Sequence, residues 1–269
     1  MTQKLSRAIV RAPAASFVSG LTRANLGPPN YQLALRQHAA YCDALESCGL
    51  TLTHLETDER FPDSTFVEDT AVMILCRQNN SGTRSHRAVI TRPGAASRRG
   101  EEQIVKQALA QLGLEILEIA SPGTVDGGDV CETDDRFFIG ISERTNEAGA
   151  GQLAEILSSS GYTYAFIDIR GHDSILHLKS GLAYLGDKRL VVIDALATQP
   201  AFHDYGLIKV ERDEEYAANC VRVNDHVLVA AGFPRFERSL QDLGYKTLSL
   251  QMSEFQKLDG GLSCLSLRF

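Results

Sequence analysis

Hydrophobic residues along the chain follow two different periods, and glycines separate the segments of one period from those of the other. The 3.6-residue period of an amphipathic helix covers residues 31–47, 101–112, 148–160 and 235–243, and more weakly 194–206. A glycine ends or closely follows each segment, which is a typical helix stop. Apolar runs of strand length come next, at residues 50–55, 114–119, 162–169, 206–211 and 245–250. The pattern therefore predicts an α/β fold.

Each predicted strand leads into a polar loop and then into a further apolar run, so the same supersecondary unit recurs five times with loop insertions. One unit cannot bury its own apolar face, so the five must share a core. A ring would remove long exposed sheet edges and bring the five loops to one central mouth. A doubly wound open sheet would leave the loops along a line. We favour the ring.

The loops carry most of the residues with acid, base or nucleophile chemistry. In chain order these are Asp63, Glu68, Asp69, Asp126, His177 and Cys264. Each has an ordinary explanation by itself, as a solvated charge, a turn former beside glycine or a core histidine. Solvated charges do not explain acids inside apolar flanks such as FVEDTAVMIL, because burying a charge is costly unless a partner is bound. Together the residues predict a site.

Cys264 lies in the terminal stretch GGLSCLSLRF, where a loop enters a predicted strand. A thiol there can face a pocket while its backbone is held, although buried free cysteines are more often core residues. The six cysteines form no C-x-x-C pair and no cluster at zinc-ligand spacing. We therefore expect reduced thiols, no metal site, and a chemical role for one or two cysteines at most.

The net charge of −7 argues against nucleic acid or an anionic membrane surface as a partner, because both require a basic face. It suits a cationic small molecule. The sequence shows neither an 18-residue apolar run nor an N-terminal signal pattern, so we expect a cytoplasmic location.

Converging carboxylates repel one another and take up protons unless a cation lies among them. A guanidinium suits this position, because it offers five N–H donors in a plane that carboxylates accept in pairs. A thiolate from Cys264 could attack the central carbon of that cation, and His177 could protonate the departing amine and then activate water. The residues thus predict an enzyme that acts on an arginine-like molecule.

Several stretches resemble the dimethylarginine dimethylaminohydrolases of the guanidino-group-modifying (amidinotransferase) superfamily. They are FPDSTFVEDTAV, ITRPGAASRR, TVDGGDV, ISERTNEAGA, HLKSG, AANC and DGGLSC. The resemblance implies a five-bladed α/β-propeller in one domain over residues 1–269. It also implies hydrolysis of N,N-dimethylarginine or monomethylarginine to citrulline and an amine through a covalent S-alkylthiouronium intermediate, without a cofactor.

The resemblance also implies a role for each matching residue. Cys264 would be the nucleophile, His177 the general acid and base, and Asp126 would hold the guanidinium; the family has Asp or Glu at this position. The substrate-binding residues would be Leu21, Asp63, Glu68, Asp69, Arg98, Arg144 and Leu258. Within this set the two arginines would pair with the α-carboxylate, Leu258 would offer a backbone contact, and Leu21 would close a lid formed by GLTRANLGPPN.

Two stretches depart from the family pattern and look like insertions, RQNNSGTRSH at residues 77–86 and RGHDS at 170–174. Two rival functions also stay open. One is a sister reaction on the same scaffold, arginine deimination or citrulline hydrolysis. The other is a non-catalytic protein that binds arginine-like metabolites, which would not need both Cys264 and His177. The sequence does not decide between a monomer and a homodimer.

Overall fold

The computed structural model describes residues 4–76, 85–172 and 174–269, and within them it contains five sheets of three strands each. The strands are β1 (Arg7–Arg11), β2 (Thr51–Leu55), β3 (Ala71–Cys76), β4 (Ser85–Ile90), β5 (Glu115–Glu118), β6 (Val130–Glu132), β7 (Arg136–Ile141), β8 (Thr163–Asp168), β9 (Leu182–Tyr184), β10 (Arg189–Ile193), β11 (Gly206–Val210), β12 (Val221–Val223), β13 (His226–Ala230), β14 (Lys246–Leu250) and β15 (Ser266–Arg268). The helices are α1 (Tyr31–Ser47), α2 (Glu102–Gln111), α3 (Glu147–Ser159), α4 (Pro234–Asp242) and α5 (Ser253–Gln256).

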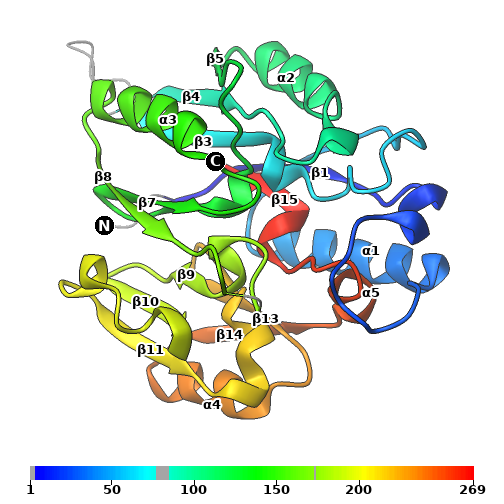
Figure 1. Cartoon of the computed structure of the whole chain (residues 1–269). Coiled ribbons are helices and arrows are strands. Elements are labelled where there is room, and N and C mark those ends of the chain that lie inside the picture. Colours follow the sequence, from blue (N-terminus) through cyan, green and yellow to red (C-terminus); the bar gives the residue numbers. More distant parts are fainter. Residues whose placement is uncertain (1–3, 77–84, 173) are drawn as a thin grey trace.

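All five sheets share one topology. The inner strand is antiparallel to the middle strand, as in Val130↔Ile139 of β6 and β7, and the middle strand is parallel to the outer one. A parallel connection needs a crossover, and α1 to α4 supply it in four of the sheets. Figure 1 shows these helices around the outside of the molecule. The repeated ββαβ unit and the ring predicted from the sequence are both confirmed.

The two ends of the chain complete one of the sheets. Strand β15 is antiparallel to β1, with Leu267 opposite Ile9, and β1 is parallel to β2. The last strand of the chain thereby completes the sheet that contains the first strand. The five inner strands surround a channel of about 950 Å³, with lining residues from β3, β6, β9, β12 and β15.

Local signals explain why the helices lie where the sequence predicts them. The side chain of Asn30 accepts a hydrogen bond from the Leu33 N–H and caps α1. Gly49, with a φ of 91°, then turns the chain into β2. Asn146 caps α3 in the same way, and Gly161 follows it with a φ of 84°.

The helical segment predicted at residues 194–206 is wrong. The structure has two short 3₁₀ helices there, Asp194–Leu196 and Pro200–Phe202. Pro200 has no N–H and cannot continue a helix that begins before it. Leu196 and Phe202 still pack into the core, which preserves the apolar pattern. Within the described residues no helix is long and apolar enough to cross a bilayer.

Candidate active site

Four short 3₁₀ helices meet at one end of the channel, and each directly precedes an inner strand. They are Val67–Thr70 before β3, Gly127–Asp129 before β6, Leu178–Ser180 before β9 and Ser263–Leu265 before β15. The first of them contacts both the second and the fourth, and the second contacts the third. The ring therefore brings together the loops in which the sequence places the candidate residues.

A cavity of about 20 Å³ lies among these loops, and eight of the ten candidate residues line it. They are Leu21, Asp63, Asp69, Arg98, Arg144, His177, Leu258 and Cys264. Four further residues, which were not predicted, line the cavity: Phe66, Leu176, Asp259 and Gly260. Leu176 is next to His177, Asp259 and Gly260 belong to DGGLSC, and Phe66 lies within FPDSTFVEDTAV, so proximity to a motif was the available signal.

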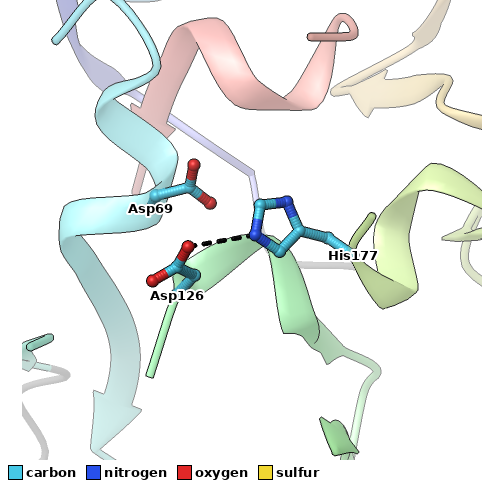
Figure 2. Close-up of side chains that lie close together, drawn as sticks. All are labelled: Asp69, Asp126 and His177. Carbon is cyan, nitrogen blue, oxygen red and sulfur yellow. Dashed lines mark hydrogen bonds and ion pairs between the residues drawn. The ribbon is translucent and has the colours of Figure 1, made fainter. Parts of the chain in front are cut away.

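His177 and Asp126 form a buried hydrogen-bonded pair in the site. Nε2 of His177 lies 3.1 Å from Oδ2 of Asp126, and Figure 2 shows this contact with Asp69 beside the imidazole. The N–H of Gly94 donates to Oδ1 of Asp126 and fixes the carboxylate. Burial lowers the pKa of His177, but the surrounding carboxylates, Asp69 first, outweigh it and raise the pKa to about 9. His177 is therefore protonated at neutral pH.

Asp69 is held as a carboxylate by two donors. Nη1 of Arg98 lies 2.6 Å from Oδ2, and the N–H of Gly128 donates to Oδ1 over 2.9 Å. Burial works against ionisation, but His177 and Arg98 lower the pKa of Asp69 to about 2. A Cβ on Gly128 would lie 2.8 Å from Oδ1 of Asp69 and 2.9 Å from the His177 ring, so this position of TVDGGDV requires glycine.

Asp69, Asp126 and His177 also have donor atoms within 4.8 Å of one another, which is close enough for one metal ion. The hydrogen bonds described above already use Nε2 of His177 and both oxygens of Asp69. These hydrogen bonds account for the close approach of the three residues, and the absence of a metal site stays a prediction.

Cys264 lies in the 3₁₀ helix Ser263–Leu265, at the entrance to β15, and its residue is 8% exposed. The Gly261 N–H points at Sγ over 3.4 Å. Burial, followed by the carboxylates of Glu68 and Asp69, raises the pKa of this thiol to about 12. The sulfur is therefore a neutral thiol at neutral pH, and the imidazolium of His177 lines the same cavity.

Comparisons with known proteins show the family to which the chain belongs. The family model of the eukaryotic N,N dimethylarginine dimethylhydrolases matches residues 28–207. The N(G),N(G)-dimethylarginine dimethylaminohydrolase of Pseudomonas aeruginosa is 44% identical over 262 residues, which cover 97% of this chain and 98% of that protein. This chain belongs to the dimethylarginine dimethylaminohydrolase family.

Solved structures of this family have the same fold. A cysteine-to-serine variant of the Pseudomonas aeruginosa enzyme, complexed with citrulline, has a TM-score of 0.91 at 42% identity and covers 99% of this chain and 100% of its own. A histidine-to-glycine variant with an S-methyl-L-thiocitrulline adduct has a TM-score of 0.90 at the same identity, covering 98% and 100%. The five-bladed α/β-propeller implied by the resemblance is confirmed.

In this member of the family, residues 20–23 lie over the cavity. The Leu21 N–H donates to Oδ1 of Asp63, and the Arg23 N–H donates to Oδ2 of Asp259. A Cβ on Gly20 would lie 2.8 Å from both Asp63 and the Leu258 side chain, so the segment fits only with glycine there. Because a cavity of about 20 Å³ is far smaller than usual ligand pockets, we expect this segment to move when an amino acid binds.

Arg98 pairs with protein groups beside the cavity, and the role that the resemblance implies for it, pairing with the α-carboxylate, stays a prediction. It is buried, and its guanidinium donates to Asp69, to Oε1 of Glu101 and to the Phe66 carbonyl. Burial raises the pKa of Glu101 to about 7, although Arg98 opposes the shift. Arg98 therefore contacts Asp69 and also lines the cavity. Arg144 is only partly buried and lines the same cavity, so it is better placed for a substrate carboxylate.

The structure does not bring Glu68 into the cavity. Its Oε1 lies 2.7 Å from Nζ of Lys179 and 3.0 Å from Nη2 of Arg268, and its Oε2 accepts a hydrogen bond from Ser263. These residues line the channel on the other side of the site. Successive residues of a 3₁₀ helix point about a third of a turn apart, which separates Glu68 from Asp69.

The two apparent insertions lie away from the cavity as far as the structure describes them. Residues 77–84 lie outside the described residues, and β4 begins at Ser85. Arg170 pairs with Asp168 and Glu147 at the surface. His172 is partly buried and does not line the cavity, and Asp173 is outside the described residues.

Proposed function

We propose that Cys264 carries the hydrolysis of N,N-dimethylarginine and monomethylarginine to citrulline and the methylated amine, through a covalent thiouronium intermediate. Membership of the family makes the protein a hydrolase of C–N bonds in linear amidines. The observation that supports the mechanism is that Cys264, His177 and Asp69 line one cavity while Asp126 holds the imidazole.

The cavity suits a zwitterionic amino acid with a cationic side chain. Asp69 and Asp126 would accept N–H groups of the guanidinium, since a carboxylate oxygen can take more than one hydrogen bond. Arg144 would pair with the α-carboxylate, and the backbone at Leu258 and the side chain of Leu21 would enclose the chain between the two ends.

The bound cation activates the sulfur. In the free protein the pKa of Cys264 is raised to about 12, because burial and nearby carboxylates disfavour the thiolate. A guanidinium within a few ångström favours the thiolate, since opposite charges lower the pKa of an acid. The thiol releases its proton to solvent, and the thiolate then attacks the central carbon and forms the C–S bond.

His177 moves the protons of both halves of the reaction. Its imidazolium donates a proton to the departing amine as the C–N bond breaks, which leaves the thiouronium on Cys264. The neutral imidazole next takes a proton from water, whose oxygen attacks the same carbon. The C–S bond then breaks, and citrulline and the thiol result. The net change is addition of one water and loss of one amine.

One assay tests the reaction against its rivals. The purified protein is incubated in parallel with dimethylarginine, monomethylarginine, arginine and citrulline, and citrulline, methylated amines and ammonia are measured. We expect citrulline and methylated amine in equal amounts from the first two. Faster ammonia release from arginine or citrulline would favour a sister reaction, and binding without product would favour a binding protein.

The cysteines support a location in a reducing compartment. All six are free, including five that are buried. We propose the cytoplasm as the location on this ground. A monomer or a homodimer both stay compatible with the structure.

A further inference from the structure

The side chain of Asn219 joins the two loops that carry the nucleophile and the general acid. Its Oδ1 accepts a hydrogen bond from the Ser263 N–H over 2.8 Å. Its Nδ2 donates to the Lys179 carbonyl over 3.0 Å and to Oγ of Ser263 over 3.1 Å. Ser263 precedes Cys264, and Lys179 follows His177 by two residues. One amide therefore connects the backbone next to the sulfur with the backbone next to the imidazole.

The packing around Asn219 leaves it little freedom. The residue is 6% exposed, and a Cβ on Gly261 would lie 2.5 Å from Cγ of Asn219. In the 3₁₀ helix just before it, Tyr216 donates its hydroxyl to the Gly260 carbonyl over 2.8 Å. The segment before β12 thus contacts Gly260, Gly261 and Ser263 of DGGLSC from one side. This accounts for the AANC and DGGLSC stretches together.

We propose that Asn219 is a positioning residue that fixes Cys264 relative to His177, so that sulfur and proton donor reach the same carbon. The proposal rests on the proposed function, because it concerns the alignment of those two groups. Asn219 does not line the cavity, so it acts through the backbone of its partners. A misplacement of about 1 Å can cost about 100-fold in rate when reacting groups must align.

The expected result for Asn219→Ala is a kcat lowered about 10- to 100-fold, with KM within about 3-fold of the wild type. KM changes little because Asp69 and Arg144, which face the substrate, make no contact with Asn219 among the described hydrogen bonds. Asn219→Asp keeps the acceptor for Ser263 but points an oxygen at the Lys179 carbonyl. We expect it to be impaired as well.

Asn224 provides a matched control five residues later, in the turn between β12 and β13. Its side chain also makes three hydrogen bonds to backbone, with the Leu5 N–H, the Leu5 carbonyl and the Cys48 carbonyl. It connects segments away from the catalytic cavity. We expect Asn224→Ala to lower the melting temperature at least as much as Asn219→Ala, partly because Asn224 has a φ of 54°, and to leave kcat within about 2-fold.

A second substrate separates alignment from general damage. When S-methylthiocitrulline is the substrate, the leaving group is methanethiolate, which departs without the proton that an amine needs. If Asn219 aligns the proton donor with the sulfur, Asn219→Ala should lose more kcat on dimethylarginine than on S-methylthiocitrulline, by about 5-fold or more. Asn224→Ala should show the same ratio of the two rates as the wild type.

Three outcomes would overturn the proposal. They are a wild-type kcat in folded Asn219→Ala, equal losses on both substrates, or the same kinetic change in Asn224→Ala. If Asn219→Ala does not fold, Gly261→Ala displaces the amide without removing it and should change the substrate ratio in the same direction. If the wild type is active and the variants leave the ratio of the two rates unchanged, only the role of Asn219 is refuted. An inactive wild type removes the proposed function as well.

Discussion

The wall between the catalytic cavity and the central channel is built from neighbouring residues that face opposite ways. Asp69 and Cys264 line the cavity, and Glu68 and Ser263, one position earlier in each case, line the channel. Both pairs lie in 3₁₀ helices that meet at the channel end. The same short turns therefore supply the chemistry on one side and a hydrogen-bonded support on the other.

The two sides differ in how their charges are balanced. On the channel side Glu68 has two cations, Lys179 and Arg268. On the cavity side two acids, Asp69 and Glu101, share the single guanidinium of Arg98. Glu68 thus has two cations of its own, whereas Asp69 shares one guanidinium with a second acid and lines the cavity in which a cationic substrate would bind. Charge balance, rather than residue type, thus separates a structural acid from a functional one.

The largest expected effect comes from the sulfur on the cavity side. Cys264→Ser should lower kcat by about 10⁴-fold or more, because a serine hydroxyl has no base positioned to ionise it. The fold should persist, since the change is small. Cys76→Ser, which alters a thiol that lines the channel, is the control and should keep kcat within about 3-fold. Normal turnover by Cys264→Ser would remove the nucleophile from the mechanism.

His177 comes next in expected effect. His177→Gly should lower kcat about 10²- to 10⁴-fold, because the amine leaves and water attacks without proton transfer. Intact-protein mass spectrometry should detect substrate carbon bound to Cys264 in this variant. His172→Gly is the matched control, since His172 lies five residues earlier and does not line the cavity. Steady-state rates that match those of the wild type would contradict the assignment.

Variants of Asp69 and Glu68 directly test the difference between the cavity side and the channel side. Asp69→Asn should lower kcat/KM about 10- to 150-fold, because a charge-assisted hydrogen bond to the guanidinium is worth about 1.5–3 kcal/mol. It should also lower the pKa of His177, since Asp69 is the first carboxylate that raises it. A pH profile of kcat/KM measures both effects.

Glu68→Gln should behave in the opposite way. It leaves the ammonium of Lys179 and the guanidinium of Arg268 largely buried without their carboxylate, so the free energy of unfolding should fall by about 3 kcal/mol. We expect kcat/KM to stay within about 3-fold. If this variant raises KM as much as Asp69→Asn does, Glu68 belongs to the substrate site, as the resemblance implies.

The sequence predicted the features that local signals encode. Residues 31–47 form α1 as predicted, because the apolar period, the Asn30 cap and Gly49 agree. The helix predicted at residues 194–206 does not form, because Pro200 interrupts it. Whether the side chains of Glu68 and Asp69 face the cavity or the channel depends on how the ring closes. The local sequence around these two residues does not encode that closure.

The candidate site shows the same limit. Residues within the motifs were predicted to belong to the site, but the contacts between different motifs were not predicted. Glu101 lies three positions after Arg98 and forms an ion pair with it, a contact that no motif indicates. Asn219 was visible in AANC without a role, because its partners lie 40 and 44 residues away. The pairing of β15 with β1 likewise joins the two ends of the chain.

The smallest expected effect is a pH dependence of stability that only the cavity side should show. The pKa of His177 in the folded protein is about 9, above its ordinary value of 6.5, so folding favours the protonated form. Its contribution is fully present below about pH 6.5 and is lost as pH rises through about 9, with about 1 kcal/mol lost between pH 8 and 9.5. Urea unfolding at several pH values measures this slope. His177→Gly should remove it and Glu68→Gln should retain it, whereas equal slopes in both variants would place the titrating group elsewhere.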